Sequence, residues 1–261
     1  MEKWCLLKDT DTLEPAVNMA VEEVVAQEVG NSSFPPALRL WKNEQKCFVL
    51  GKLTHTNFNS NHPTGKVIQK GEIALVKRFS GGKVIFQNGG CLNFSVTVPS
   101  NHKFAFDKIG KTFKTLSSGV MRALNNLGVC ARYGRVDAVF CPGPYDIVVR
   151  GRKLAGVSLA RRSKFTLVHG TLLVNIDLDE YIEIMEKFYQ DLGENKKLQK
   201  DKITSLSKEM GREITLDEII SHIVRGYTEV FGIQFIKQSL SPLQRYQAEK
   251  LSSNYKIQFA T

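Results

Sequence analysis

Tight turns between strand-like segments limit the folds open to this chain. Residues 145–150 and 153–160 are rich in the β-branched and apolar residues typical of strands. The Arg150-Gly151-Arg152 sequence between them predicts a hairpin turn. A glycine pair in Ser80-Gly81-Gly82 separates further strand-like runs within residues 73–98. Strands joined by such short turns run antiparallel, so a strictly parallel sheet is excluded.

Amphipathic helices interrupt the strand series at irregular intervals. The predicted helices are 15–29, a long one over 107–128, 178–190, 215–231 with a capping box at Thr215 and Glu218, and a short one that begins at Ser241-Pro242. The predicted strands are 38–41, 48–51, 145–150, 153–160 and 166–175, with two or three more within residues 73–79 and 84–98. We therefore expect an α+β domain in which helices flank a mixed, largely antiparallel sheet.

The composition is that of a globular domain of the cytoplasm. Hydrophobic residues make up 42% of the 261 residues and charged residues 24%, and both values are ordinary. No apolar run approaches the roughly 18 residues of a transmembrane helix, and the N-terminus lacks the apolar core of a signal peptide. The five cysteines include no CxxC pair, and the histidines show no ligand spacing. We expect free thiols in a reducing compartment, no bound metal and no membrane partner.

A formal net charge of +10 at pH 7 predicts an acidic partner. Nucleic acid and an acidic protein both meet this description. The chain has no zinc-finger spacing, no RNP-type motif and no long Lys/Arg block, so nucleic acid is the less favoured of the two. The densest run of cations, at Lys196, Lys197, Lys200 and Lys202, is as readily explained by a solvated surface.

The glycine pair Gly81-Gly82 is the first candidate binding element. Because glycine has no side chain, such a turn can pass close to a ligand. Free backbone N–H groups in the turn can hold a carboxylate, a thioester oxygen or a phosphate. Arg78 and Lys83 place positive charge on either side of it. The same residues would also suit an ordinary hairpin with two turn glycines.

A thiol and an amine near the predicted hairpin form the second candidate. Cys141 lies in a loop rich in proline and glycine just before the 145–150 strand. A thiol in a loop is accessible, and neighbouring cations favour its thiolate form. The hairpin could return Lys153 to the start of that strand. A cysteine nucleophile and an ammonium that polarises a carbonyl suit acyl transfer, although an inert thiol and an exposed lysine would fit the same sequence.

Taken in order, these segments resemble those of the lipoate-protein ligase and octanoyltransferase family. The similarity extends over residues 1–235 and lies in a series of short motifs. In the two candidate segments the matching residues are Arg78, Ser80, Gly81, Gly82, Leu92, Asn93, Asp146, Gly151, Lys153, Ala155, Gly156 and Ser158. Elsewhere they are Asn18-Met19-Ala20, Glu22-Glu23, His169-Gly170-Thr171-Leu172-Leu173-Val174 and Ile203-Thr204-Ser205-Leu206.

The resemblance implies a fold of the biotin/lipoate protein ligase type. Residues 1–235 would form the catalytic domain and residues 236–261 a helical extension of it. Beside the catalytic Cys141 and Lys153, the substrate-binding residues would be Arg78, Ser80, Gly81, Gly82, Lys83, Asn93, Asp146, Gly156, Ser158 and His169. Lys83 replaces the family's third glycine and Gln87-Asn88 its His-Asp, so the acyl pocket is expected to differ in detail. The Gly-Arg-Gly-Arg loop of biotin ligases is absent, which argues against biotin transfer.

Two chemistries occur among proteins with this resemblance. A ligase activates free lipoate with ATP and Mg²⁺, whereas a transferase moves the acyl group between carrier proteins through a cysteine thioester and needs no nucleotide. The loop Phe140-Cys141-Pro142-Gly143 resembles that of transferases that take octanoyl from the glycine-cleavage H protein. The resemblance therefore favours octanoyl or lipoyl transfer through Cys141 to a lysine of an acidic lipoyl domain, in the H protein or a 2-oxoacid dehydrogenase E2. The alternatives are an ATP-dependent lipoate ligase and, third, a non-enzymatic lipoyl-protein or nucleic-acid-binding module.

Overall fold

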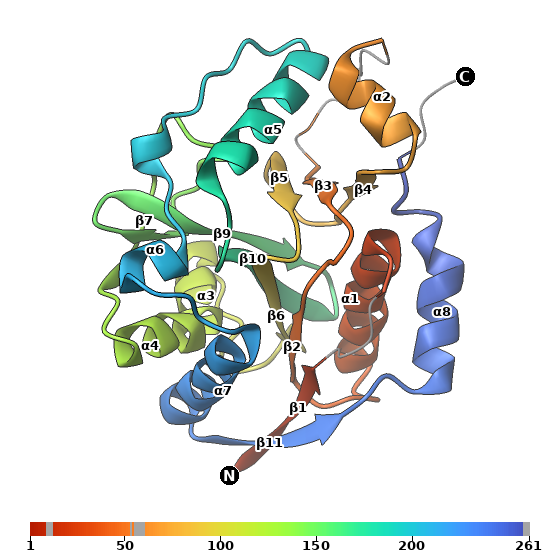
Figure 1. The fold of residues 1–261 in the computed structure, drawn as a ribbon. Coiled ribbons are helices and arrows are strands. Elements are labelled where there is room, and N and C mark those ends of the chain that lie inside the picture. The colour runs from red at the N-terminus through yellow and green to blue at the C-terminus, as the bar shows by residue number, and fades with distance from the viewer. Residues whose placement is uncertain (9–12, 53, 55–60, 258–261) are drawn as a thin grey trace.

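Two β-sheets form the centre of the protein (Figure 1). The computed structural model describes residues 1–8, 13–52, 54 and 61–257. Within these residues, the strands of the large sheet are β1 (Glu2–Lys8), β2 (Ala37–Trp41), β6 (Cys91–Pro99), β7 (Ala131–Gly134), β8 (Asp146–Val149), β9 (Arg152–Arg161), β10 (Phe165–Leu173) and β11 (Ile233–Gln238). Those of the small sheet are β3 (Cys47–Leu50), β4 (Ala74–Lys77) and β5 (Val84–Gln87).

Most neighbouring strands are antiparallel. The large sheet has the order β11-β1-β2-β6-β10-β9-β8-β7. Every pair from β2 to β7 is antiparallel, whereas β1 lies parallel to both β2 and β11. In the small sheet, β3 is parallel to β4 and antiparallel to β5. The α+β architecture with a mixed, largely antiparallel sheet is thus confirmed.

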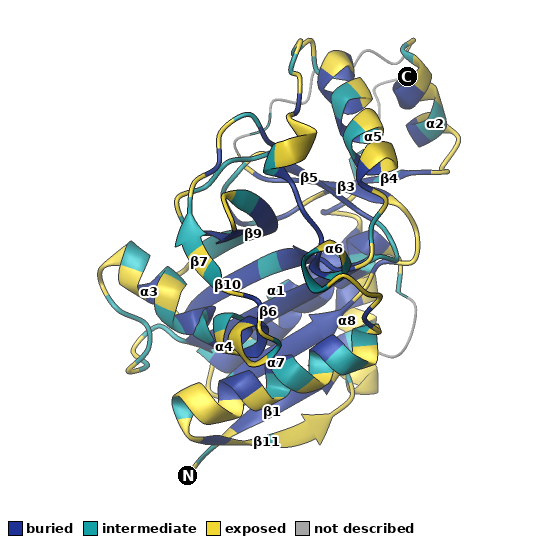
Figure 2. Cartoon of the chain, turned by 60° about the vertical axis from the view of Figure 1, so that its left-hand side comes forward, coloured by how far each residue is buried: buried dark blue, intermediate teal, exposed yellow. Residues whose placement is uncertain are grey.

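Helices cover both faces of the large sheet (Figures 1 and 2). They are α1 (Pro15–Gly30), α2 (Pro63–Gln69), α3 (Ile109–Leu116), α4 (Ser118–Asn126), α5 (Leu178–Asp191), α6 (Leu206–Met210), α7 (Leu216–Phe231) and α8 (Pro242–Ser252), with a 3₁₀ turn at Lys200–Lys202. α1 packs on one face with α8 outside it, and α4 and α7 cover the other. The small sheet lies at one end, beside α5. None of the described helices is long and apolar enough to cross a bilayer.

The helix α1 is buried along most of its length. It lies between the large sheet and α8, and its sequence, rich in alanine and valine, suits an apolar environment on nearly all sides. Its buried polar side chains include Asn18 and Glu22. A polar group in such a position requires hydrogen-bond partners, and both find them on the face of the sheet where the candidate site lies.

The helices α4 and α7 cross at two glycines. A Cβ atom on Gly226 of α7 would lie 2.3 Å from the carbonyl oxygen of Gly119, and one on Gly119 of α4 would lie 2.3 Å from the ring of Tyr227. The helices therefore meet backbone to backbone. Tyr227 fills the space over Gly119 and donates a hydrogen bond to the carbonyl oxygen of Leu116 at 2.7 Å.

The predicted single helix over residues 107–128 is wrong, because the chain bends at Ser117 into α3 and α4. The Ser117 hydroxyl donates to the carbonyl oxygen of Phe113 at 2.6 Å, and a hydroxyl that bonds back to the preceding turn bends a helix. The bend lets α3 contact β9 while α4 contacts α7. The other predicted helices and strands are confirmed, with ends shifted by one or a few residues.

The capping box predicted at Thr215 is only half formed. The Thr215 hydroxyl accepts the backbone N–H of Glu218 at 3.1 Å, but the Glu218 carboxylate binds Arg212 instead of returning to the cap. A reciprocal box is present at the start of α8, where Ser241 and Gln244 exchange both hydrogen bonds.

The edge formed by β1 and β11 was not predicted from the sequence. The proposed domain boundary between residues 235 and 236 falls inside β11, which pairs with β1. Residues 258–261 of the predicted extension lie outside the described residues. The short strand β7 and the helices α2 and α6 were also missed.

Replacement of Gly226 by alanine should destabilise the fold. The added methyl group has no space against Gly119, and overpacking of this kind costs about 1–3 kcal/mol. The free energy of unfolding, from urea titration, measures the effect. Ser221→Ala, on the exposed side of the same helix, is the control and should change stability by less than about 0.5 kcal/mol. Equal stability of the two variants would contradict the close crossing.

Candidate active site

A cavity of about 280 Å³ opens on the α1 face of the large sheet, between that sheet and the small one. Its lining is mostly apolar, which suits a ligand with a hydrocarbon body and a few polar contacts. The apolar side chains include Met19, Trp41, Val49, Ile85, Phe113 and Phe140. The polar ones include Glu22, Arg78, Gln87, Asn93, Lys153, His169 and Thr171.

A β-bulge in β9 gathers three of the predicted residues on the cavity side. Ile147 pairs with Ala155 but Val148 pairs with Lys153, so Leu154 is an extra residue in β9. In a regular strand Lys153 would face away from Gly156 and Ser158, because successive residues alternate between the two faces. The extra residue shifts this alternation. Lys153, Gly156 and Ser158 consequently all line the cavity.

The loop between β7 and β8 places Cys141 at the cavity. Ala138 and Cys141 have φ angles of 61° and 38°, a conformation that costs of order 1–3 kcal/mol in a residue other than glycine. Contacts from other segments of the chain hold the loop in this conformation. The N–H of Gln199 donates to the Ala138 carbonyl oxygen at 2.9 Å, and Tyr189 hydrogen bonds to the backbone of Cys141. The half-buried sulfur accepts the backbone N–H of Lys83 at 3.0 Å.

A buried ion pair supports the same loop from the sheet. The Nζ atom of Lys153 lies 2.8 Å from Oδ2 of Asp146, and it donates to the carbonyl oxygens of Phe140 at 3.0 Å and Cys141 at 2.8 Å. All three N–H groups of the ammonium are therefore engaged. Asp146 also accepts the N–H of Gly143 at 2.8 Å. Burial raises the pKa of Asp146, and the charge of Lys153 opposes that shift. The hairpin thus returns Lys153 to the start of the preceding strand, as predicted.

The predicted glycine turn brings Arg78 next to the sulfur. Gly82 has a φ angle of +90°, and a Cβ atom there would lie 2.6 Å from Nη2 of Arg78 and 3.1 Å from Sγ of Cys141. Position 82 must therefore be glycine for both side chains to keep their places. Nη2 of Arg78 and Sγ of Cys141 thus both lie next to Gly82, and Ser158 donates to the Gly81 carbonyl oxygen at 3.0 Å.

A chain of buried hydrogen bonds connects Arg78 to α1. Nε of Arg78 donates to the Ser80 hydroxyl at 3.0 Å, and that hydroxyl lies 2.6 Å from Nε2 of His169. Nδ1 of His169 lies 2.9 Å from Glu22. Because a carboxylate only accepts hydrogen bonds, Nδ1 of His169 donates to Glu22. The order Ser80-His169-Glu22 is that of a catalytic triad, but Ser80 does not line the cavity, and its oxygen already accepts from Arg78.

A ring of polar side chains occupies part of the cavity wall. Gln87 donates to the Thr171 hydroxyl at 2.7 Å, Thr171 donates to Asn93 at 2.7 Å, and the Asn93 amide returns to Gln87 at 3.4 Å. The cross-strand pair Thr171 and Asn93 fixes two members of the ring. Gln87, which stands where the family has histidine, thus completes a closed hydrogen-bond ring. Asn88 accepts the N–H of Gly90 at 3.0 Å.

The cavity brings together most of the predicted site residues. Those that line it are Arg78, Gly81, Gly82, Asn93, Cys141, Asp146, Lys153, Gly156, Ser158 and His169. Ser80 and Lys83 lie beside it, and the exposed Lys83 side chain points toward Glu194, 3.7 Å away. Lys83 therefore contributes its backbone N–H rather than its charge to the cavity wall. Sequence reasoning gave Glu22 and Thr171 no place in the site, because no local spacing connects α1 with β10.

The other described cysteines are placed less favourably for chemistry. Cys91, at the start of β6, is fully buried, and burial raises its pKa to about 12. Burial also raises the pKa of Cys5 and Cys47. Cys130 is exposed but does not line the cavity. Of the described thiols, only Cys141 combines access with contact to the cavity.

The fold and this arrangement define a member of the lipoate ligase class. Residues 14–228 match the model of the lipoyl protein ligase A/B catalytic domain. The match covers well over half of the chain, which therefore belongs to this family.

Curated relatives and solved structures match nearly the whole chain. Octanoyltransferase LipM of Oceanobacillus iheyensis is 23% identical, over 97% of this chain and 95% of the relative. Octanoyltransferase LipM of Brevibacillus brevis is 24% identical, over 96% and 95%. A putative lipoate protein ligase from T. acidophilum with bound lipoic acid superposes with a TM-score of 0.73 at 22% identity, over 97% and 96% of the two chains. Lipoate-protein ligase A bound with ATP gives 0.73 at 23%, over 97% and 95%. These structures confirm the fold of the lipoate ligase type.

Removal of Lys153 should expose how strongly the ion pair holds the loop. Lys153→Met leaves Asp146 buried without its partner, and the free energy of unfolding should fall by about 3–5 kcal/mol. Lys153→Met/Asp146→Asn should lose less than the sum of the two single variants, since no buried charge is then unpaired. Urea unfolding of the three variants completes a double-mutant cycle. Additivity within about 0.5 kcal/mol would contradict direct coupling of the pair.

Proposed function

We propose that this protein moves an octanoyl or lipoyl group from a carrier protein to a lysine of a lipoyl domain, through a thioester on Cys141. The observation that carries the proposal is the position of the Cys141 sulfur, which meets a largely apolar cavity and a backbone N–H donor. The relatives named octanoyltransferase LipM support the same reaction.

The proposed reaction has two steps that balance without a nucleotide. The Cys141 thiolate attacks the acyl carbonyl of the donor, an S–C bond forms, the bond from the carbonyl carbon to the donor sulfur or nitrogen breaks, and the departing group takes a proton from water. The amine of the acceptor lysine then attacks the thioester, a C–N bond forms, the S–C bond breaks, and the Cys141 thiolate is released while the amine gives a proton to water. The apolar cavity wall holds the acyl chain in both steps, and the turn at Gly81-Gly82 lets the backbone approach it.

Lys153 is proposed to stabilise the negative charge that develops on the acyl oxygen. Its three N–H groups bind Asp146 and the carbonyl oxygens of Phe140 and Cys141. To bind the acyl oxygen, it exchanges one of these carbonyls for the substrate. A single donor of this kind is worth about 3–4 kcal/mol in a transition state. Asp146 keeps the ammonium in place during the exchange.

An ATP-dependent lipoate ligase is the second candidate. The solved structures with the same fold include lipoate-protein ligases, one of them bound with ATP. ATP and Mg²⁺ would then form an acyl-adenylate from the free acid. Such an enzyme has no chemical need for a thiol at the position of Cys141, so this residue separates the two candidates.

Incubation with an octanoyl-loaded carrier protein should acylate Cys141 in the absence of ATP. The carrier is offered in two forms, as a thioester and as the H-protein amide. Intact mass should show an octanoyl adduct that hydroxylamine removes, and an apo lipoyl domain added next should become octanoylated. Cys141→Ala should lose both signals, while Cys130→Ala, the matched exposed thiol, should keep them. Labelling from free octanoate with ATP and Mg²⁺ that survives Cys141→Ala would overturn the transferase in favour of the ligase.

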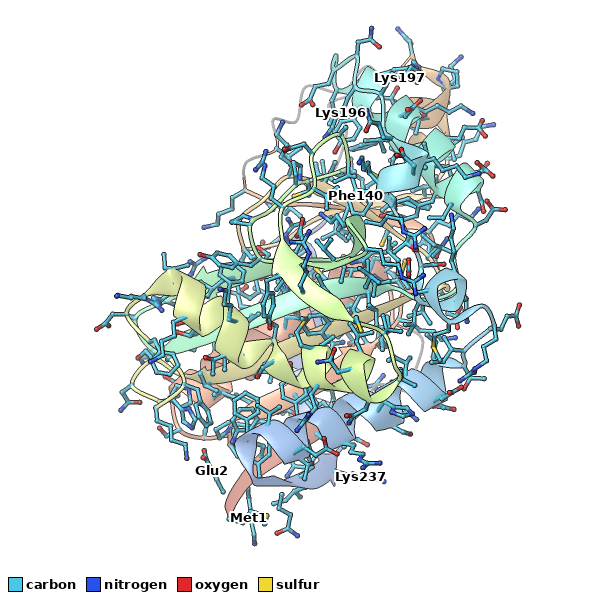
Figure 3. All side chains as sticks on the ribbon, turned by 90° about the vertical axis from the view of Figure 1, so that its left-hand side faces the viewer. Met1, Glu2, Phe140, Lys196, Lys197 and Lys237 are labelled. Atoms are coloured by element: carbon cyan, nitrogen blue, oxygen red, sulfur yellow. The ribbon has the colours of Figure 1, made fainter. Side chains whose placement is uncertain are left out.

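The proposed acceptor and donor are acidic lipoyl-domain proteins, in keeping with the net charge of +10. Cations lie close to Cys141: the Lys83 side chain is exposed, and Lys196 packs over the ring of Tyr189, which touches the loop. Figure 3 shows Lys196 and Lys197 in the same upper part of the molecule as Phe140, the neighbour of Cys141, with Lys237 at the opposite end. Exposed charges of this kind steer encounter rather than hold a complex.

Transfer should therefore slow as salt rises. The apparent second-order rate constant should fall about tenfold between low and high ionic strength, since steered association is strongly salt dependent. The single-turnover rate at saturating carrier should not change. Lys83→Gln should lower the second-order rate constant about two- to threefold at low salt, whereas the matched Lys237→Gln should not. A rate constant that is flat across ionic strength would reject steering.

A further inference from the structure

The contacts of Arg78 leave a positive charge in the protein without an adjacent carboxylate. The residue is buried, with 9% of its surface exposed. Its guanidinium donates to the carbonyl oxygens of Val49 at 3.0 Å and Gly81 at 2.8 Å, and to the hydroxyl of Ser80 at 3.0 Å. All three acceptors are neutral. Among the described residues, no carboxylate oxygen lies within ion-pair distance of Arg78, and Glu22 acts on it only at longer range.

A buried guanidinium stays charged and needs a negative partner. Among the described residues, the neighbour of Arg78 that can become an anion is the sulfur of Cys141, since a Cβ atom on Gly82 would lie 2.6 Å from Nη2 of Arg78 and 3.1 Å from Sγ of Cys141. A neutral thiol is a weak acceptor, yet the Lys83 N–H donates to this sulfur at 3.0 Å and the Arg78 guanidinium lies beside it. Such convergence suits a thiolate.

We propose that Arg78 is the counter-ion that holds Cys141 as a thiolate, and that Ser80, His169 and Glu22 are positioning residues that hold Arg78 against the sulfur. This rests on the proposed function only in naming the thiolate as the nucleophile. The chain of three fixes the orientation of Nε of Arg78, while the Val49 carbonyl fixes Nη1. Gly82 leaves room for Nη2 to reach Sγ.

The other charges around Cys141 are already engaged or lie farther away. Lys153 reaches the loop only through the carbonyl oxygens, and Asp146 neutralises it. From α5, Tyr189 hydrogen bonds to the Cys141 backbone rather than to the sulfur. Lys196 stacks on Tyr189, and burial lowers its pKa, with Lys83 adding to that shift. Arg78 is therefore the described cation that is placed to pair with the sulfur.

The test is the pH dependence of Cys141 alkylation, which needs no acyl donor. Iodoacetamide alkylation of the full chain is followed by intact mass in a Cys130→Ser background, which removes the exposed thiol. Each rate is divided by its plateau at high pH, so that differences in access cancel. At pH 6.5 the normalised rate should exceed that of glutathione about tenfold or more, the effect of an opposite charge in contact.

Arg78→Gln in the same background should lose that advantage, about tenfold at pH 6.5. Arg162→Gln is the matched control, because Arg162 donates to the carbonyl oxygens of Arg161 and Phe79 and does not line the cavity. It should keep the parent profile. Ser80→Ala, which removes the hydroxyl that joins Nε of Arg78 to His169 and leaves the other contacts of Arg78 in place, should shift the profile in the same direction as Arg78→Gln by a smaller factor.

Two results would overturn the inference: a background protein whose normalised profile follows glutathione, or a folded Arg78→Gln protein with the parent profile. If circular dichroism shows that Arg78→Gln is unfolded, the inference is judged on the alkylation profiles of the Cys130→Ser protein and of Ser80→Ala in that background. Failure here is distinct from failure of the proposed function. Loss of acyl transfer in Cys141→Ala together with an unshifted alkylation profile would reject Arg78 alone, whereas transfer that survives Cys141→Ala would reject the thioester route.

Discussion

The buried ion pair of Lys153 and Asp146 is the interaction on which the site depends. Burial of two charges is costly unless geometry and additional hydrogen bonds compensate for it, and here every donor of the ammonium has an acceptor. Two of those acceptors belong to the loop that contains Cys141, whose backbone is in a conformation unfavourable for a side-chain-bearing residue. Because both charged residues lie on strands, the pair fixes the conformation of the loop relative to the sheet. A lysine that could serve chemistry is at the same time part of the support for the nucleophile.

The sequence predicted which residues form the site better than it predicted how they are arranged in space. The hairpin at Arg150-Gly151 was recognisable because both turn residues have positive φ angles, as the favoured two-residue turn requires. The glycine pair and Cys141 were recognisable as well. Their convergence was not, because Gly82 and Cys141 belong to loops on different sheets. The bulge at Leu154 left no trace in the pattern of apolar residues, although without it Lys153 would face away from Gly156.

Longer-range features were the least predictable part of the fold. Ser117 bends a helix through one hydroxyl contact that competes with an otherwise continuous apolar stripe. Glu22 has the appearance of a surface residue in the sequence, and its burial follows only from the packing of α1 on His169. The hydrogen-bond partner of Glu22 lies 147 residues away in the sequence. Local sequence propensity does not predict such a contact. The sequence feature that could have indicated it is the presence of polar residues on the otherwise apolar helix α1.

The pairing of β1 with β11 has a consequence for how the protein is made. Residues 2–7 of β1 form their outer ladder with residues 233–238, so the sheet is incomplete until residue 238 has left the ribosome. During synthesis β1, with its buried Trp4 and Leu7, presents an unpaired edge that other chains could join. Contacts this distant in sequence also form slowly. Correct folding of the β1 edge therefore depends on β11, and truncation before β11 would leave an aggregation-prone protein.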